Sequence, residues 1–543
     1  MRYFKIYILL VYLLVLSGSL LAQQGRKIDI VQGGHVMEGV FRNNQRFDRL
    51  IGDADKRVIF KQNTTTIYCD SAFLYREQNR VEAYGNVKII EKDTITITGR
   101  KLVYEGNSKI AQMLGNAVYK DPSLTIESDA MQYDMLNNLA SYSERGKLFD
   151  EVNTLTSDIG SYHTESKFAA FKDRVVLVNP EHTLYSDTLQ YNTVSKIAYI
   201  RGPSTVISKE DSSVFRFHEG ELNTLQDVSV FGKGYIETAS YILEGDTLFS
   251  DDANRFYSAT SNVKLISKEE NIIITGDLGQ YWKDQGLTKV SGSPIMRKIM
   301  ETDTLYVAAD TLVSIDSKII EERRILAYHQ VKIFKQEMQG IADSIAYHSS
   351  DSIIYFYMDP VLWYNENQIE ADSINMKLVD GGMDKMNLDV NCFLISKDTM
   401  LQTFNQVKGR EMTVYFKNNQ LDNAYVFGNG ESVMFAADDK DNALIGLNKI
   451  LCSSMTIRFK DGQFNNASFY TKPEASFIPP HEIKPPDKEL SGFNWRKEER
   501  PEKQDIFKKR TKKEEPTNII DVIKEILPEM PGAANLAPLI PVK

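Results

Sequence analysis

Polar and apolar residues alternate along short stretches through most of this chain. Thr94–Thr98 alternates without a break, and Leu124–Glu127 and Val331–Ile333 repeat the pattern. A period of two places every second side chain on the same face, which is typical of a half-buried β-strand. Turn-forming residues such as Asn137–Asn138 separate the stretches. No helical apolar stripe interrupts residues 60 to 470, so the sequence predicts an all-β array.

A second pattern is the spacing of tyrosines and aspartates along this array. Five tyrosines follow one another at intervals of 29 residues: Tyr75, Tyr104, Tyr133, Tyr162 and Tyr191. An aspartate stands four residues before three of them and recurs later in the chain: Asp129, Asp158, Asp187, Asp277, Asp310, Asp343 and Asp372. A fixed period of this size is the signature of a repeat architecture. It favours a long surface or interior over a single catalytic pocket.

One repeat can be followed from Leu124 to Phe149. Leu124–Tyr133 forms one strand, Asn137–Asn138 turns the chain, and the return strand begins at Leu139. Glycines such as Gly115 recur inside the strand patterns, where they mark a bend. Short strands joined by Asn-rich turns favour antiparallel hairpins over the crossovers of a parallel β-helix.

The first 22 residues have the pattern of a secretory signal. Arg2 and Lys5 precede the apolar run Ile6–Leu16, and small residues follow up to Ala22. The run is short for a membrane span, so cleavage after Ala22 is favoured over an uncleaved anchor. The sequence then predicts no transmembrane span in the mature chain.

Composition divides the rest of the chain into four parts. Residues 23–58 form a lead-in, and residues 59–470 form the repeat array, taken as one body or as two lobes, 59–250 and 251–470. Residues 471–516 are rich in proline and charge, which predicts a flexible segment. Residues 517–543 form a tail in which the apolar spacing of Ile519–Leu527 predicts one short helix.

The charge balance and the motifs exclude several classes of function. Lys and Arg total 64 against 74 for Asp and Glu, a net charge of −10, so nothing supports nucleic-acid binding. The seven histidines show no metal-ligand spacing, and no nucleotide fingerprint occurs, so we expect no catalytic residue, metal or cofactor. Three cysteines, Cys69, Cys392 and Cys452, allow at most one disulfide within the chain.

Three short stretches of residues 83–104 carry a resemblance to a known family. Their sequence pattern resembles that of the OstA/LptA family, the periplasmic proteins of lipopolysaccharide transport; the stretches are Ala83–Val87, Ile95–Gly99 and Leu102–Tyr104. The resemblance covers about residues 60–470. It implies an elongated antiparallel β-jellyroll, or β-taco, built here from hairpin repeats of about 29 residues. The chain differs from the family in having many more repeats and a Pro- and charge-rich C-terminus.

The resemblance implies a function as well as a fold. We expect an exported, non-enzymatic protein of the periplasm, associated with the outer membrane of a Gram-negative cell. Lipopolysaccharide or another envelope lipid would bind in an apolar β-groove, and other transport components would stack end to end on the array. The lipid-groove candidates, chosen from the alternating strands, are Ile95, Ile97, Leu124, Ile126, Val263, Leu265, Ile273 and Ile333.

Two alternatives to the lipid carrier remain open from the residues alone. One is a structural or adhesive β-solenoid with a closed core, in which the tyrosines pack repeat on repeat. The other is a polysaccharide lyase on a parallel β-helix, which the hairpin turns disfavour. In the tail, Phe493, Trp495 and Arg496 are candidates for docking a partner, and the alternative is that they fold back to cap the last repeat.

Overall fold

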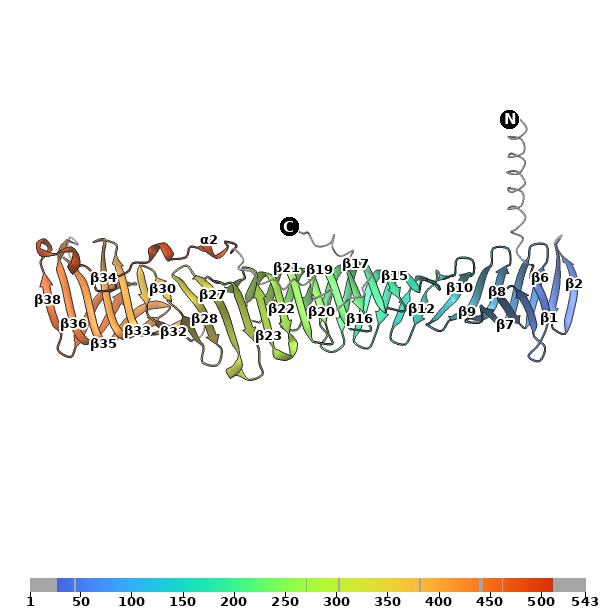
Figure 1. The fold of residues 1–543 in the computed structure, drawn as a ribbon, viewed down its shortest axis with the longest axis horizontal. Helices are drawn as coiled ribbons and strands as arrows, with labels where there is room; N and C mark the ends of the chain where they lie inside the picture. The colour runs from blue at the N-terminus through green and yellow to red at the C-terminus, as the bar shows by residue number, and fades with distance from the viewer. Residues whose placement is uncertain are drawn as a thin grey trace, which may run out of the picture. The chain divides into compact units, whose positions relative to one another are not determined.

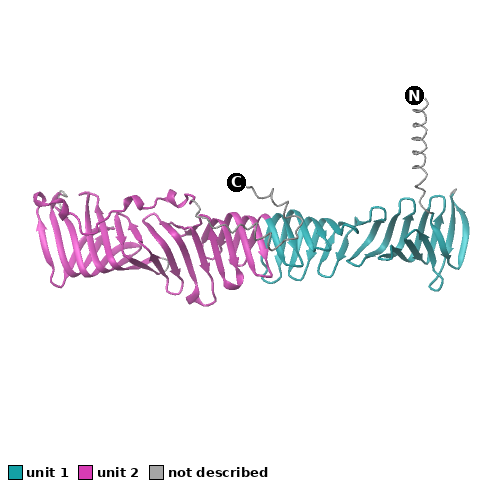
Figure 2. Ribbon diagram, viewed as in Figure 1, with its two compact units in different colours: residues 1–231 teal, residues 232–543 magenta. Residues whose placement is uncertain are grey.

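The structure, a computed structural model, describes residues 27–42, 45–269, 271–300, 303–379, 382–438, 443–460 and 462–510. The expected signal segment and the expected tail helix lie outside these residues. The chain divides into two compact units, residues 1–231 and 232–543 (Figure 2). Both consist of antiparallel strands, which confirms the all-β antiparallel fold class. Within each unit the strands follow one another largely in chain order (Figure 1).

Unit 1 contains the following strands, the last of which also holds the boundary between the units. They are β1 (Asp29–Gly33), β2 (Val36–Arg42), β3 (Gln45–Ile51), β4 (Val58–Gln62), β5 (Thr65–Cys69), β6 (Ser71–Tyr75), β7 (Arg80–Glu91), β8 (Ile95–Glu105), β9 (Ile110–Lys120), β10 (Thr125–Asp134), β11 (Leu139–Tyr142), β12 (Gly146–Phe149), β13 (Thr154–Ser157), β14 (Ile159–His163), β15 (Phe168–Val178), β16 (His182–Asn192), β17 (Ile197–Ser208), β18 (Val214–Asn223) and β19 (Val228–Glu237).

Unit 2 continues the pattern with longer strands toward its end. Its strands are β20 (Tyr241–Asp251), β21 (Phe256–Ser267), β22 (Ile272–Trp282), β23 (Leu287–Ser291), β24 (Ile295–Ile299), β25 (Thr304–Ala308), β26 (Thr311–Ile315), β27 (Arg324–Phe334), β28 (Met338–His348), β29 (Ile353–Tyr357), β30 (Val361–Tyr364), β31 (Asn367–Glu370), β32 (Ser373–Val379), β33 (Gly382–Asp398), β34 (Thr403–Lys417), β35 (Gln420–Ala437), β36 (Leu444–Lys460), β37 (Gln463–Tyr470) and β38 (Glu474–Ile478). Its helical pieces are η1 (Lys283–Gln285), η2 (Ile320–Glu322), η3 (Pro480–Glu482), η4 (Pro485–Asp487), η5 (Lys497–Glu499) and α2 (Lys503–Ile506).

Most long strands bend at a corner in their middle. At Gly85–Asn86 both residues have positive φ, at 72° and 40°, and the pairing with β8 shifts register at the same point. Gly115–Asn116 bends β9 in the same way. The backbone there is left-handed, which glycine and asparagine adopt most easily. The glycines that the sequence marked as bends therefore lie at corners, and each corner divides a strand between two sheets.

The recurring aspartates lie at these corners. Asp70 accepts a hydrogen bond from Asn86 at 2.8 Å, and Asp246 accepts one from Asn262 at 2.7 Å. Asp158 binds Arg174 in the same relation, sixteen residues before its partner. Asp372 accepts a hydrogen bond from Asn391 at 3.0 Å, so aspartates at the corner position make structural contacts with the next corner.

In unit 1 the two sheets face each other across a core of tyrosines. We call the sheet that carries Tyr104, Tyr133, Tyr162 and Tyr191 the tyrosine sheet, and the sheet that carries Ile89, Ile97 and Ile126 the isoleucine sheet. In unit 2 the same names denote the layer that carries Tyr257 and Tyr281 and the layer that carries Leu265 and Ile274. Tyr119 of the isoleucine sheet lies between the rings of Tyr133 and Tyr162, with ring centroids 5.9 and 6.0 Å away. The four tyrosines that define the tyrosine sheet are each at most 1% exposed.

The tyrosines in this row pair across the sheet with small residues, mostly alanines; Tyr104 has Val81 on one side and Ala111 on the other. Tyr133 lies opposite Ala111 on one side and Ala140 on the other, and Tyr162 lies opposite Ala140 and Ala169. Alternation of large and small side chains lets neighbouring repeats interdigitate at close packing. Tyr75, the first of the series in sequence, is out of phase: its neighbour Leu74 is the buried residue, and Tyr75 packs against Phe47 instead.

A seam of polar contacts closes the outer margins of the two sheets in unit 1. Turns at the margin of the isoleucine sheet meet turns at the margin of the tyrosine sheet through three pairs, each 46 residues apart. They are Lys92–Asn138 at 3.1 Å, Asp121–Lys167 at 3.4 Å and Asp150–Lys196 at 2.7 Å. The Asp150 side chain is 0% exposed and that of Lys196 is 14% exposed. The seam therefore buries charge, and it repeats with the array.

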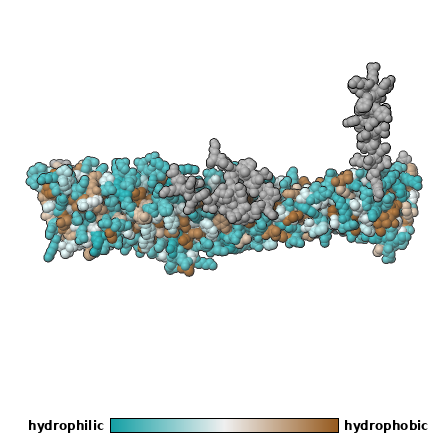
Figure 3. All heavy atoms as spheres, in the orientation of Figure 1, coloured by the Kyte–Doolittle hydropathy of each residue, from teal (hydrophilic) through white to brown (hydrophobic). Residues whose placement is uncertain are grey.

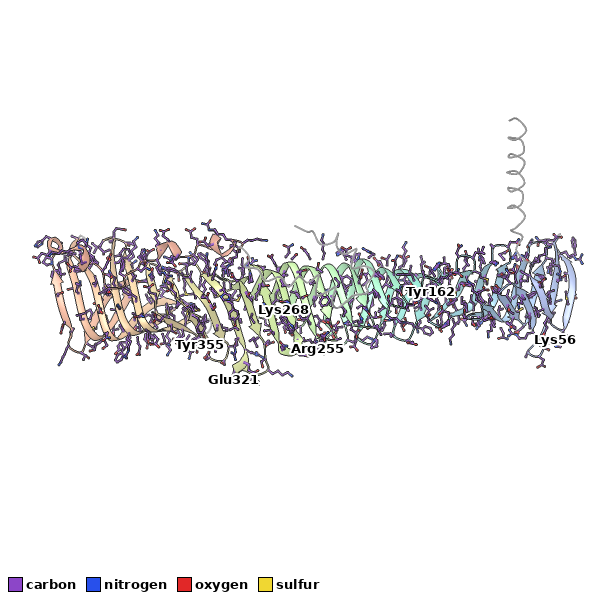
Figure 4. All side chains as sticks on the ribbon, viewed as in Figure 1. Lys56, Tyr162, Arg255, Lys268, Glu321 and Tyr355 are labelled. Carbon is purple, nitrogen blue, oxygen red and sulfur yellow. The ribbon has the colours of Figure 1, made fainter. Side chains whose placement is uncertain are left out.

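The carboxylates of the seam also hold the tyrosine hydroxyls. Tyr162, labelled in Figure 4, donates to Asp121 at 3.1 Å, and Tyr191 donates to Asp150 at 2.7 Å. Burial and the nearby carboxylates raise the pKa of both phenols. Burial would raise the pKa of Asp150, but hydrogen bonds from Lys196, from the turn amides and from Tyr191 outweigh it and hold this pKa below its usual value.

In unit 2 the chain after β38 runs back over the outer face of the isoleucine sheet (Figure 1). We call residues 479–510 the strap. Leu490 is buried in a cluster with Phe393, Ile395 and Val433, on the face of the sheet opposite the interior. α2 lies against β25 and β27. The sequence predicts a flexible segment from residue 471, but β38 adds a strand at residues 474–478 and the strap packs on the sheet, because its apolar side chains find an apolar outer face.

Ala169→Leu is expected to destabilise unit 1, because the added methylenes have no space between Tyr162 and Tyr191. Overpacking of this kind costs about 1–3 kcal/mol. Ala170→Leu is the matched control, since Ala170 is the next residue of β15 and is exposed. Urea denaturation of both variants checks the prediction. Equal midpoints would mean that the tyrosine row tolerates a larger neighbour and is not closely packed.

Asp150→Asn is expected to destabilise unit 1 strongly at pH 7, because it leaves Lys196 without its buried partner. Losing one member of a buried ion pair costs about 3–5 kcal/mol. The folded pKa of Asp150 is depressed, so its stabilisation is present above the usual carboxyl pKa and is lost as the pH falls through the folded value. The difference in stability between wild type and variant should therefore shrink below about pH 4.

The matched control for this pair is Asp158→Asn, which removes an ion pair with the largely exposed Arg174. Urea denaturation of both variants at pH 7 and at pH 3 provides the comparison. A cost for Asp150→Asn no larger than that of Asp158→Asn, or one that grows as the pH falls, would contradict a buried seam.

Candidate functional site

The inner face of the isoleucine sheet in unit 2 carries a continuous apolar row. Six residues lie opposite one another on successive strands: Leu243, Leu265, Ile274, Met296, Val307 and Ile333. The row runs across β20, β21, β22, β24, β25 and β27. Together with the tyrosine sheet of unit 2 it faces the interior of that unit.

This row is partly open to solvent, unlike its counterpart in unit 1. Leu243, Leu265 and Met296 are partly exposed, as is the adjacent Leu305. The corresponding row in unit 1 has no member more than 2% exposed: Ile89, Ile97, Tyr119, Ile126, Leu148, Leu155, Leu177 and Leu184. The interior of unit 1 is therefore filled by its own side chains, and the interior of unit 2 leaves apolar surface accessible between about residues 243 and 305.

The tyrosine sheet of unit 2 shows the same change. Its inner row continues as Tyr257, Tyr281 and Tyr347, and all three are partly exposed. Tyr257 and Tyr281 stack with ring centroids 6.1 Å apart, and the Tyr257 hydroxyl donates to Asp252 at 2.8 Å. Here the carboxylate lies in the tyrosine sheet's own turn. In unit 1 the carboxylates that hold Tyr162 and Tyr191 lie across the seam.

Toward the end of unit 2 the margins meet again. Tyr364 donates to the carbonyl of Asn419 at 2.9 Å, and the Asn367 side chain donates to the carbonyl of Gly462 at 2.7 Å. Phe356 and Ile374 are each 1% exposed in this part of the core. Partly exposed apolar side chains such as Leu378 and Phe464 also pack against this core later in the unit, but the margins there are joined by these hydrogen bonds.

The structure places the predicted groove residues as follows. Seven of the eight point to the interior. Ile95, Ile97, Leu124, Ile126, Val263 and Ile333 are buried, and Leu265 packs partly exposed against the core. Ile273 faces the opposite side, because its neighbours Ile272 and Ile274 occupy the inner positions. The run Ile272–Ile274 is apolar on both faces, so alternation could not fix its register. Lipid contact stays a prediction for all eight.

The three partner-docking candidates contact the chain's own unit 2. Phe493 and Trp495 lie 5.5 and 5.1 Å from the ring of Phe404. Arg496 binds Asp359 through two hydrogen bonds of 2.9 Å. This placement corresponds to the alternative in which the aromatic cluster folds back on the array. A partner role stays a proposal.

Other chemistry has little support in the described part of the chain. Cys69 and Cys392 are buried free thiols in different units, and burial raises the pKa of each to about 12. Among the described residues no three His, Cys, Asp or Glu side chains group as metal ligands would. The helices within the described ranges are all too short or too polar to span a bilayer.

Sequence analysis missed the residues that distinguish the two interiors. Met296, Leu305 and Leu243 belong to the same pattern of alternation as the buried positions of unit 1. What differs is the seam: Asp121, Asp150 and their lysines are ordinary turn residues in sequence, and only their 46-residue separation relates them. That separation, read together with the 29-residue period, is the signal that could have found them.

Part of the chain is similar to known proteins. Residues 41–187 match the family model described as OstA-like protein. No curated protein matches the chain. One similar solved structure is LptH, the LptA homologous periplasmic component of the lipopolysaccharide transport device from Pseudomonas aeruginosa. It is 13% identical, covers 22% of this chain and 82% of its own, and has a TM-score of 0.19.

A second solved structure is the WD40 domain of SCAP from fission yeast. It is 11% identical and has a TM-score of 0.10, with 79% of this chain and 97% of that chain covered. The family match falls entirely within unit 1, and it includes Tyr104, Tyr133 and Tyr162 of the tyrosine row and the start of the seam. Residues 41–187 of this chain are therefore similar to OstA-like protein.

Proposed function

We propose that this chain is an exported OstA-like protein that takes part in lipopolysaccharide transport and outer-membrane assembly. It binds the acyl chains of an envelope lipid, lipopolysaccharide first, between the two sheets of unit 2. Its place is the periplasm of a Gram-negative cell, at the outer membrane. It acts as a carrier and not as an enzyme, and it needs no cofactor.

The observation that carries this proposal is the partly exposed inner row around Leu265 and Met296. Apolar surface on the interior of a two-sheet structure fits a linear hydrocarbon chain, which gains about 0.8 kcal/mol for each buried CH₂ group. Tyr257 and Tyr281 add amphipathic rings at the margin, where an acyl chain joins its polar head. The OstA-like match to residues 41–187 supports lipopolysaccharide as the first lipid to test.

The end of unit 1 supports a role for other transport components. β2 pairs with β3 along one side and exposes Phe41 at 72% and Met37 at 54%. Apolar residues are visible at this end of the unit in Figure 3. A strand that leaves main-chain groups and apolar side chains exposed is a template for pairing with a strand of another protein. End-to-end stacking of a transport partner would use this strand.

A structural role is the second candidate, and the closed interior of unit 1 favours it. The seam pairs Asp121–Lys167 and Asp150–Lys196 leave a core filled by tyrosines. If the partly exposed row of unit 2 holds no lipid, the chain is a structural or adhesive β-solenoid without lipid cargo.

Met296→Glu is expected to lower the affinity for lipopolysaccharide at least tenfold with little effect on folding. A carboxylate in the apolar interior must lose its hydration when an acyl chain covers it, and tenfold in affinity corresponds to only about 1.4 kcal/mol. Thr275→Glu is the control, because Thr275 lies on the outer face of neighbouring β22. Titration with fluorescently labelled lipopolysaccharide measures both variants.

Native mass spectrometry of the protein purified from its own envelope completes the test. Bound lipid in wild type, reduced in Met296→Glu and retained in Thr275→Glu, would support the carrier. Absence of lipid from the wild-type protein, together with equal titration curves for both variants, would leave the structural β-solenoid as the function.

A further inference from the structure

The strap covers one particular row on the outer face of the isoleucine sheet in unit 2. Cross-strand pairing runs through Gln406, Ile395, Gln368, Trp363, Gln339, Phe334 and Tyr306, from β34 to β25. These residues alternate with the inner positions along their strands, so they share the outer face. All but Phe334 and Tyr306 are buried.

Three glutamines of this row hold the strap through its backbone or side chains. Gln406 accepts from the Leu490 amide and donates to the Lys488 carbonyl, both at 2.8 Å. Gln368 donates to the carbonyl of Asn494 at 2.7 Å and accepts from the Arg496 amide at 2.8 Å. Each of these two glutamines therefore satisfies one backbone amide and one backbone carbonyl of the strap, as a neighbouring strand would.

The third glutamine and the last described residues continue the same path. Gln339 accepts a hydrogen bond from the Arg500 side chain at 2.7 Å. Phe507 then packs against Tyr306 with ring centroids 5.7 Å apart. The side chain of Arg510, the last described residue, donates to Asp310 at 2.8 Å, and its backbone amide donates to the Ser293 hydroxyl at 3.0 Å; both partners lie at strand corners beside the row. The strap thus advances by two strands for about every five residues, toward lower-numbered strands.

The row does not end where the described strap ends. From Tyr306 it continues through Arg297, Ile273, Ile266 and Ile242, on β24, β22, β21 and β20. All four are partly exposed. The Nε atom of Arg297 is buried and has no hydrogen-bond partner among the described residues. Three isoleucines in register beside a guanidinium whose Nε atom lacks a hydrogen-bond partner form an apolar surface with a basic end.

The residues that follow Arg510 have the chemistry that this surface requires. Lys512 and Lys513 come first, two glutamates follow at 514 and 515, and the apolar group comes next: Ile519, Ile520, Val522, Ile523, Ile526 and Leu527. The four strand-to-strand steps from Tyr306 to Ile242 span about 19 Å at the usual strand spacing. The eight residues 511–518 can reach about 26 Å when extended. The chain beyond Arg510 is therefore long enough to place its apolar group over the isoleucine row.

We propose that residues 511–527 continue the strap and dock on Ile273, Ile266 and Ile242, with Glu514 or Glu515 meeting Arg297. The occupant of this outer surface is thus the chain's own C-terminal segment, not a lipid or another protein. The interior surface around Met296 lies on the opposite face of the same sheet, so this docking does not depend on the proposed lipid binding. The docked segment would cover the outer face of the strands whose inner face lines the open interior.

A photo-crosslinking amino acid at position 266 of the full chain tests this docking. We expect an intrachain crosslink to residues 511–527, found by peptide mass spectrometry in a product of monomer mass. The matched control places the same amino acid at Thr154, on the outer face of the isoleucine sheet in unit 1, where no crosslink to these residues is expected. A crosslink at dimer mass, one to any other segment, or none would overturn the proposal.

A second variant separates docking from chance proximity. Ile519→Glu combined with Ile523→Glu, in the chain with the probe at 266, should reduce the crosslink at least fivefold. Both changes lie beyond the packed strap, so the circular dichroism spectrum should stay that of the parent. An unchanged crosslink yield would show that these side chains do not hold the segment, and would overturn the proposal as well.

Discussion

The structure depends on the corner that divides each long strand between two sheets. Two consecutive residues of left-handed backbone, as at Gly85–Asn86, bend the strand without ending it. Because the corner falls at the same place in successive strands, inner positions align across many hairpins. The 29-residue period follows, since two strands of eleven residues and two short turns make one repeat. The buried tyrosines recur at that period because each occupies the same inner position.

What changes along the chain is how the margins of the two sheets are joined. In unit 1 the carboxylate, lysine and tyrosine contacts of the seam bring the margins together, and the interior is filled. In the first half of unit 2 the inner rows keep partly exposed leucines, methionine and tyrosines. The same repeat therefore builds a packed core in one unit and an accessible apolar surface in the other. The proposed lipid-carrier function rests on the interior of unit 2, and the structural alternative rests on the interior of unit 1.

The sequence predicted the fold class well, because alternation and period are local properties that tertiary packing left unchanged. It predicted seven inner positions and misassigned Ile273, because Ile272–Ile274 is apolar on both faces and only pairing with Met296 and Arg297 decides the register. It could not locate the seam, since Asp150 and Lys196 look like solvated turn residues until the sheets bring them together. The proline-rich composition of residues 479–510 concealed the strap, whose few apolar side chains have buried partners only on unit 2.

Photoaffinity labelling with a lipopolysaccharide that carries a reactive group in an acyl chain tests the central claim most directly. The account predicts adducts on the inner residues of β20 to β27, between Leu243 and Ile333, and none on the inner residues of unit 1 between Ile89 and Leu184. Adducts concentrated in unit 1 would contradict the closed seam. A complete lack of adducts, with a labelled lipopolysaccharide-binding protein as positive control, would contradict the carrier function.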